Sequence, residues 1–167
     1  LPFDSSATVV TRETGYAAGP SLRPHFWIPV SLDRGAAGRF MGPATGGTDA
    51  VGRYTYAAGA LVAGAPARVV AAFDGVSHLL GNPSLDLSLS SDWSLAAVVS
   101  NTVVSESDRK AALGATFVMR RWETVASLRV AAEYEGTRFV AIPDAVPATI
   151  CGGCVGRDVI GGSVTLG

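Results

Sequence analysis

A regular alternation of apolar and polar residues recurs along the chain and limits its fold more than any other feature. Between 82 and 91, leucine occupies every second position from Leu85 to Leu89, and serine or aspartate fills the positions between. Successive side chains of a β-strand point to opposite faces, so this pattern predicts a strand with one apolar and one polar face. No segment shows a convincing helical period.

The same period recurs often enough to predict an all-β fold, an antiparallel up-and-down meander of about eight long strands. One strand, 94–104, is added because long and tight connections can alternate between the two ends of a barrel only if this segment is also a strand. Residues 33–52 and 136–157 are predicted to be long loops, and 1–22 a linker or N-terminal extension. The predicted strands are 23–32, 53–63, 67–76, 82–91, 94–104, 111–121, 124–135 and 158–167.

Composition indicates what the apolar faces contact. The chain is 48% hydrophobic and only 16% charged, whereas ordinary globular domains carry about 25% charged residues. A disordered chain is therefore excluded. The longest stretch without Asp, Glu, Lys or Arg is 54–67, too short for a membrane helix of about 20 residues. A net charge of -1 argues against a nucleic-acid partner.

Strand length and low charge favour a lipid bilayer as the apolar partner of these strands. The predicted strands match the roughly 9–11 residues that cross a bilayer at a tilt of about 45°, and they exceed the usual soluble strand of about 5–6. Residues 23–167 are accordingly predicted to form part or all of a transmembrane β-barrel. A soluble β-sandwich uses the same alternation and remains an alternative.

Two sets of side chains would have distinct places in such a barrel. Aromatic residues near strand ends would form girdles at the lipid headgroups, and charges on the polar parity would line the lumen. The girdle candidates are Trp27, Tyr54, Tyr56, Trp93, Trp122 and Tyr134. The lumen candidates are Arg53, Arg68, Asp86, Arg120, Arg129, Glu133 and Glu135. The same residues would suit the rim and the solvent face of a sandwich.

Three segments carry a family resemblance. They are SLRPHFWIP at 21–29, preceded by a linker tyrosine at Tyr16, the Gly/Asp loop GGTDAVGRYTY at 46–56, and NPSLDLSLSSDW at 82–93. Together they resemble the C-terminal outer-membrane β-barrel region of bacterial proteins whose N-terminal part is a TolB-like (PD40/WD40-like) β-propeller. The resemblance implies a barrel in a Gram-negative-type outer membrane beside an upstream periplasmic propeller. The chain shows no propeller repeat and ends without the usual terminal aromatic residue, as expected of a fragment.

Few residues suggest chemistry. Cys151 and Cys154 form a single CxxC in a glycine-rich segment, and a small loop disulfide is the favoured interpretation, with unpaired thiols as the alternative. Signatures of nucleophile elbows, phosphate-binding loops, dinucleotide sites and zinc sites are absent, so no catalytic residue, cofactor or metal is predicted. A Ser/His/Asp set at a barrel rim, built from His78 with Ser77, Asp74 and Asp86 nearby in sequence, is conceivable but less favoured than a turn histidine.

The sequence thus predicts a non-enzymatic outer-membrane β-barrel segment that acts as an envelope anchor or a transport pore. Its expected partners are the lipid bilayer and an upstream propeller. The main alternative is a secreted or periplasmic β-sandwich that binds a ligand through its long loops. A barrel-rim hydrolase is the least favoured of the three.

Overall fold

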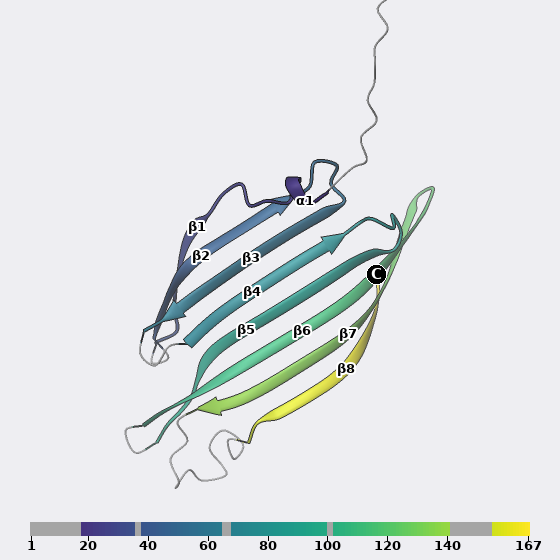
Figure 1. Cartoon of the computed structure of the whole chain (residues 1–167). Coiled ribbons are helices and arrows are strands. Elements are labelled where there is room, and N and C mark those ends of the chain that lie inside the picture. Colours follow the sequence, from purple (N-terminus) through teal and green to yellow (C-terminus); the bar gives the residue numbers. More distant parts are fainter. Residues whose placement is uncertain (1–17, 36–37, 65–67, 100–101, 141–154) are drawn as a thin grey trace, which may run out of the picture.

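The computed structural model describes residues 18–35, 38–64, 68–99, 102–140 and 155–167 (Figure 1). They form one short helix, α1 (Ala18–Ser21), and eight strands. The strands are β1 (Ile28–Asp33), β2 (Arg39–Thr48), β3 (Tyr54–Ala63), β4 (Arg68–Ser77), β5 (Ser84–Val99), β6 (Thr102–Arg121), β7 (Thr124–Val140) and β8 (Arg157–Leu166). The cysteines lie outside the described residues.

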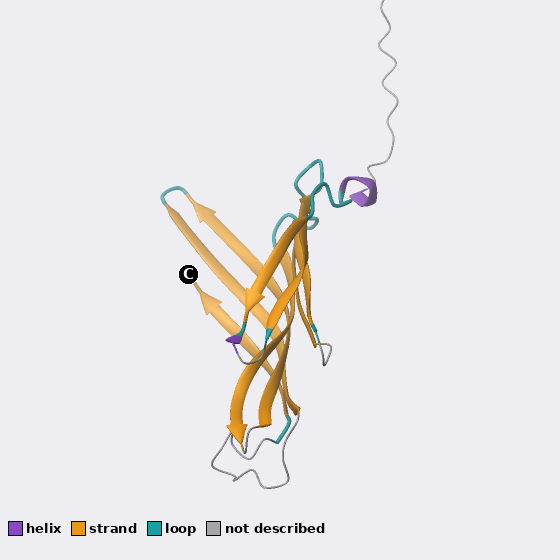
Figure 2. Cartoon of the chain, turned by 90° about the vertical axis from the view of Figure 1, so that its left-hand side faces the viewer, coloured by secondary structure: helices purple, strands orange, loops and turns teal. Residues whose placement is uncertain are grey.

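All eight strands belong to one sheet in the order β1 to β8, and each pairs antiparallel with the next. The predicted all-β antiparallel meander of eight strands is therefore confirmed. The sheet is open, with β1 and β8 as its edges. Figure 2 shows the strands as one bent layer with α1 beside one end, and the described residues contain no second sheet that could pack on it as in a sandwich.

The predicted loop at 33–52 is wrong, because it contains β2. This segment holds Gly42, Pro43, Gly46 and Gly47, which hide any alternation. Paired with β1 and β3, the glycines make room for their neighbours. A Cβ at Gly42 would meet the backbone of Leu61 at 2.9 Å.

The predicted strand at 94–104 is also wrong, because it covers the end of β5 at Val99 and the start of β6 at Thr102. β5 continues through 91–94 to Val99, and β6 begins at Thr102, so two long strands replace three shorter predicted ones. A bulge between Leu95 and Ala97 reverses the alternation there, so Leu95 and Ala97 lie on opposite faces, whereas the alternation of the sequence predicts one face for Leu95, Ala97 and Val99. The predicted count of eight was right only because one strand was missed and one was added.

The register sorts the side chains into two faces across the whole sheet. Directly paired residues lie on the same face, so Tyr54, Leu87 and Leu113 share one face, here called the apolar face. Asp86 and Arg129 lie on the other, here called the mixed face. The predicted parities of the strands at 53–63, 67–76, 111–121 and 124–135 agree with this division.

Among the described residues few apolar side chains are buried, and three of them cluster where β1 to β4 meet the middle of β5, while Val104 on β6 and Ala131 on β7 are buried elsewhere. Phe40, Leu61 and Ala63 form a small cluster on the mixed face, and Leu32, Val70 and Trp93 pack against it. The Trp93 indole also donates a 3.1 Å hydrogen bond to the Val69 carbonyl. This cluster braces one end of the sheet. Most apolar side chains lie outside it.

Candidate functional site

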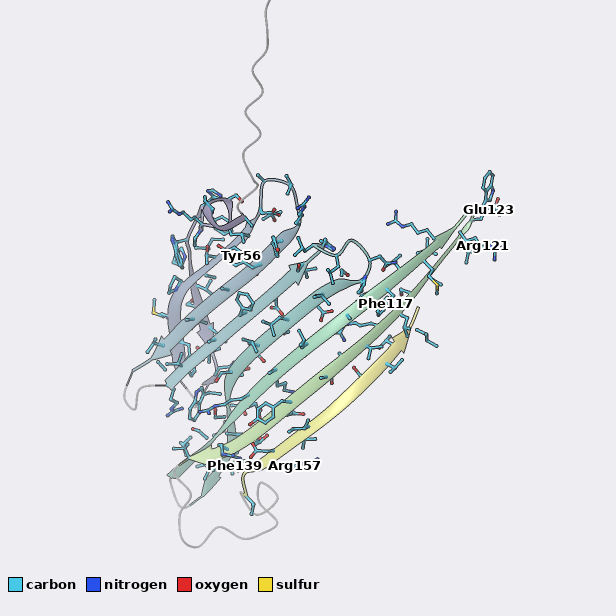
Figure 3. The ribbon with its side chains drawn as sticks, turned by 45° about the vertical axis from the view of Figure 1, so that its right-hand side comes forward. Tyr56, Phe117, Arg121, Glu123, Phe139 and Arg157 are labelled. Atoms are coloured by element: carbon cyan, nitrogen blue, oxygen red, sulfur yellow. The ribbon has the colours of Figure 1, made fainter. Side chains whose placement is uncertain are left out.

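The apolar face of β6 carries a sharply bounded band. Every apolar-face position from 111 to 119 is apolar, and Arg109 and Arg121 occupy the next position on either side. At about 3.3 Å per residue these positions span about 30 Å along the strand, or about 23 Å when tilted by about 40°. Figure 3 shows Arg121 and Glu123 at one tip of the β6–β7 hairpin and Phe139 and Arg157 toward the opposite end.

Neighbouring strands continue this band across the sheet. On β7 it runs from Ala126 to Tyr134, and on β8 from Ile160 to Leu166. The large side chains within it are exposed, with Leu113 at 58% and Ile160 at 84%. A chain that exposes a continuous apolar surface of this extent needs a partner to cover it.

The band crosses the strands obliquely. A row here means residues that are directly paired across neighbouring strands. At one limit, Arg109 ends the band on β6. Ala71 of β4 lies on the same row, but there the band continues beyond this row to the apolar Val69. At the other limit, the band on β4 stops at Ser77, which lies on the same row as Ala115 of β6. On β6 the band continues beyond this row as far as Met119. Both limits therefore shift in the same direction between β4 and β6, as a membrane plane shifts across tilted strands.

Two girdle candidates bond to polar groups at opposite limits of the band. The Tyr56 hydroxyl donates to the Leu22 carbonyl at 2.9 Å beside the β2–β3 turn. The Tyr134 hydroxyl, near the far end of β7, donates to Asp158 at 2.9 Å, and Arg138 donates to the same carboxylate at 2.7 Å. Each ring thus keeps an apolar body in the band and a hydroxyl at its border.

The remaining girdle candidates fall into different surroundings. Tyr54 begins β3 beside Tyr56, and Trp27 immediately precedes β1. Trp93 is half-buried against the small core and lies 5.9 Å below the Arg68 guanidinium. Trp122 forms the β6–β7 turn, is fully exposed, and has a φ of 39°.

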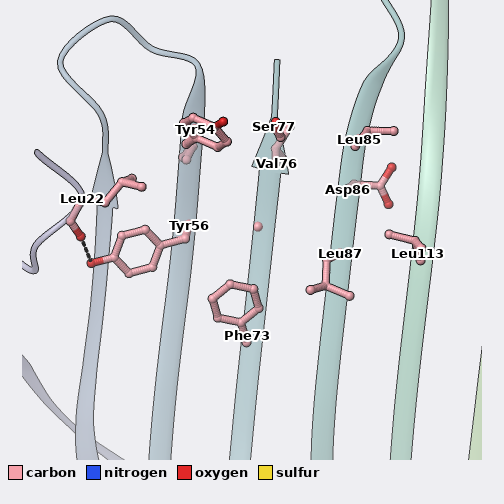
Figure 4. Close-up of a pocket in the computed structure, with 12 residues that line it drawn as sticks. Leu22, Tyr54, Tyr56, Phe73, Val76, Ser77, Leu85, Asp86, Leu87 and Leu113 are labelled. Carbon is pink, nitrogen blue, oxygen red and sulfur yellow. Dashed lines mark hydrogen bonds between the residues drawn. The ribbon is translucent and has the colours of Figure 1, made fainter. Parts of the chain in front are cut away.

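An apolar groove of about 470 Å³ lies within the band between β3 and β6 (Figure 4). Its floor includes Gly75, and the Phe73 ring covers the place where a Cβ would stand, at 3.0 Å. Tyr56 stacks at 6.5 Å from Phe73 and forms one wall, while Leu87 and Leu113 form the other. The groove is thus an uneven part of the apolar face, and Ser77 and Asp86 are the polar side chains near its β4–β5 end.

The mixed face holds an ion pair that bridges three strands. Arg129 on β7 donates to both carboxylate oxygens of Asp86 on β5, at 3.3 Å and 2.6 Å. Gly114 on β6 lies between them, and a Cβ there would meet Asp86 at 2.6 Å and Arg129 at 2.8 Å. Both charges are predicted from the polar parity of the sequence, but the position of Gly114 between them follows only from the register of β5, β6 and β7.

The other lumen candidates are spread along the sheet. Glu133 accepts a hydrogen bond from Ser163, and Glu135 pairs with Lys110 at 2.8 Å. Arg120 lies near the end of β6, and Arg53 lies in the β2–β3 turn rather than in a strand. Pairs that sequence reasoning did not find join Arg34 to Asp92 and Arg138 to Asp158, because their partners are far apart in sequence.

The strands separate the residues of the conceivable hydrolase set. Ser77 lies on the row of Tyr54, on the apolar face, whereas Asp74 and Asp86 lie on the mixed face. Asp86 is already engaged by Arg129. Within the described ranges, no three His, Cys, Asp or Glu side chains are grouped so that they could hold a metal ion.

No helix in the described part of the chain is long and apolar enough to cross a membrane. Comparison with known family models, curated proteins and solved structures finds no match to this chain.

Proposed function

We propose that this chain is a membrane-spanning segment of a bacterial outer-membrane β-barrel, serving as an envelope anchor or a transport pore. The observation that carries the proposal is the oblique, exposed apolar band, bounded on β6 by Arg109 and Arg121. Its length along the strand suits a lipid-facing band about 25 Å tall. The resemblance of segments 21–29, 46–56 and 82–93 to barrels that follow TolB-like propellers supports the same location, with a propeller upstream.

Lipid on the apolar face would make the mixed face the inner one. Its Ser, Thr, Asp, Glu and Arg side chains on β5 to β8 would then face a wet lumen, where cross-strand pairs such as Asp86–Arg129 are satisfied. Unpaired backbone groups are costly in hydrocarbon. The proposal therefore requires that β1 and β8 pair in the membrane, with each other or with further strands.

Alternating accessibility along β6 tests the proposal. In a protein with Cys151 and Cys154 replaced by serine, single cysteines are placed at Leu113 and Phe117 on the apolar face and at Ala112 and Thr116 on the mixed face. In phospholipid vesicles, a membrane-impermeant maleimide should label the second pair and a lipid-soluble reagent the first.

Two results would contradict the proposal. One is equal labelling of both faces by the aqueous reagent. The other is a wild-type chain that stays monomeric without detergent and does not float with vesicles. Single-channel conductance in planar bilayers separates the two roles, because a pore conducts ions and a plugged anchor does not.

A further inference from the structure

Arg120 differs from its neighbouring cations on the mixed face. Lys110 on the same strand pairs with Glu135 at 2.8 Å, and Arg129 on β7 pairs with Asp86 at 2.6 Å. Arg120 has no ion-pair partner among the described residues. Its direct cross-strand neighbour on β7 is Val125, so the register supplies no carboxylate beside it.

A cavity with both polar and apolar lining adjoins this arginine. The cavity has a volume of about 330 Å³ and lies between the β4–β5 turn and β6. Besides Arg120, its lining includes the side chains of His78, Ser84 and Thr116. Imidazole in either neutral tautomer has one N–H donor, and a hydroxyl can donate as well. The Thr116 hydroxyl makes no hydrogen bond within the described part of the chain. The cavity therefore offers several donors.

The turn that forms one wall is held in place. The Asn82 amide donates to the Val118 carbonyl at 2.9 Å, and its oxygen accepts from the Val118 amide at 3.0 Å. The side chain thus pairs with β6 as a strand residue would. This pairing keeps His78 and the turn beside Arg120.

No carboxylate is among the described residues that line the cavity. The nearest acidic residue on β5 is Asp86, and both of its oxygens already accept from Arg129. The guanidinium of Arg120 forms no ion pair among the described residues. A guanidinium presents paired N–H groups that match the oxygens of phosphate or carboxylate.

We infer that this cavity binds an oxyanion group, a phosphate or a carboxylate, with Arg120 as its principal ligand and Thr116 and His78 as supporting donors, since the Ser84 hydroxyl already donates to the Thr116 carbonyl at 3.5 Å. The group belongs either to a small solute or to a lipid headgroup. The inference stands on the cavity and its charges, and it holds whether or not the sheet spans a membrane.

Adjacent arginines provide a matched test. Arg120→Gln removes the cation from the cavity, whereas Arg121→Gln removes the same charge from the other face one residue away. Binding of inorganic phosphate is measured by titration calorimetry in a nonionic detergent, or in plain buffer if the chain is soluble there. We expect Arg120→Gln to weaken binding at least tenfold and Arg121→Gln to change it less than twofold.

A second arm distinguishes the source of the oxyanion. Co-sedimentation with phosphatidylcholine vesicles, with and without phosphatidylglycerol, shows whether a lipid phosphate is preferred. Dependence on Arg120 in either arm supports the inference. Equal effects of the two glutamine variants in both arms, or no binding of either probe by the wild type, would overturn it. Arg120→Lys keeps the positive charge but loses the paired N–H groups of the guanidinium, so it should bind phosphate with intermediate affinity. This variant replaces Arg120→Gln in the test if the glutamine variant does not fold.

Discussion

The two faces of β6 and β7 are built from the same strands but satisfy their side chains in different ways. On the mixed face, Asp86 and Arg129 reach across Gly114 and bond to each other. On the apolar face, Leu113 and Phe117 remain exposed in the isolated chain. The charges of the mixed face are satisfied by contacts within the sheet, whereas the large side chains of the apolar face are exposed. The difference predicts opposite responses to the same substitution.

The largest effect is expected from a charge in the middle of the apolar band. Leu113→Arg should lower the free energy of unfolding in phospholipid vesicles by about 2–4 kcal/mol, the cost of an arginine near the bilayer midplane. The matched control is Ala112→Arg on the mixed face, where the paired residue is Glu133. Urea unfolding measures both. Equal destabilisation would abolish the distinction between the faces.

The two tryptophans at positions 93 and 122 should differ next. Trp93 donates to Val69 and packs on the Phe40 cluster, whereas Trp122 is fully exposed. We expect Trp93→Ala to cost about 2 kcal/mol of unfolding free energy, since the side chain is only half-buried. Trp122→Ala should change it by less than about 0.5 kcal/mol. A larger loss at Trp122 in vesicles than in detergent would instead identify it as a membrane anchor.

Filling the gap under the ion pair should have a smaller effect. Gly114→Val places methyl groups where Asp86 and Arg129 meet, and we expect it to cost about 1–2 kcal/mol. Ala115→Val, one residue along and on the apolar face, should stay within about 0.5 kcal/mol. Thermal melts of both variants in detergent provide the measurement. If both tolerate valine equally, the Asp86–Arg129 pair does not depend on the gap.

The smallest effect concerns two ion pairs on the mixed face. Asp86–Arg129 is forked and half-buried, whereas Lys110–Glu135 has a single contact and lies exposed. Double-mutant cycles with Asn and Gln replacements should detect coupling in the first pair that persists at high salt. Coupling in the second should vanish there, because salt screens exposed charges. If salt instead abolished the coupling of Asp86–Arg129 and spared that of Lys110–Glu135, the Lys110 pair would be the one shielded from solvent, contrary to this prediction.

The sequence predicted a strand correctly where apolar and polar side chains alternate clearly along it. The alternation around Leu87 and Leu113 predicted strands and their faces correctly, because a period of two is a local property of the backbone. β2 could not be found in this way, since Gly42, Pro43 and Gly46 carry no such contrast. Its strand conformation comes from pairing with β1 and β3.

The candidate site shows the same limit. Arg129 and Asp86 were singled out as charges on the polar parity, but their pairing and the role of Gly114 depend on the β5–β6–β7 register. The cavity beside Arg120 depends on it too, because the turn after β4 meets β6 only in the folded sheet. Residues distant in sequence become neighbours through hydrogen-bonded rows that no local pattern encodes.

The sequence by itself determined that this chain forms long alternating strands with one apolar side. The β-strand is the regular structure that places alternate residues on opposite faces, so it alone separates apolar from polar side chains that alternate with a period of two. Only the tertiary structure decided which strands exist, how they align and where the band begins and ends. Backbone pairing sets the register, and a slip of one residue would move every side chain to the opposite face. The oblique band and the unpaired Arg120 are consequences of that register.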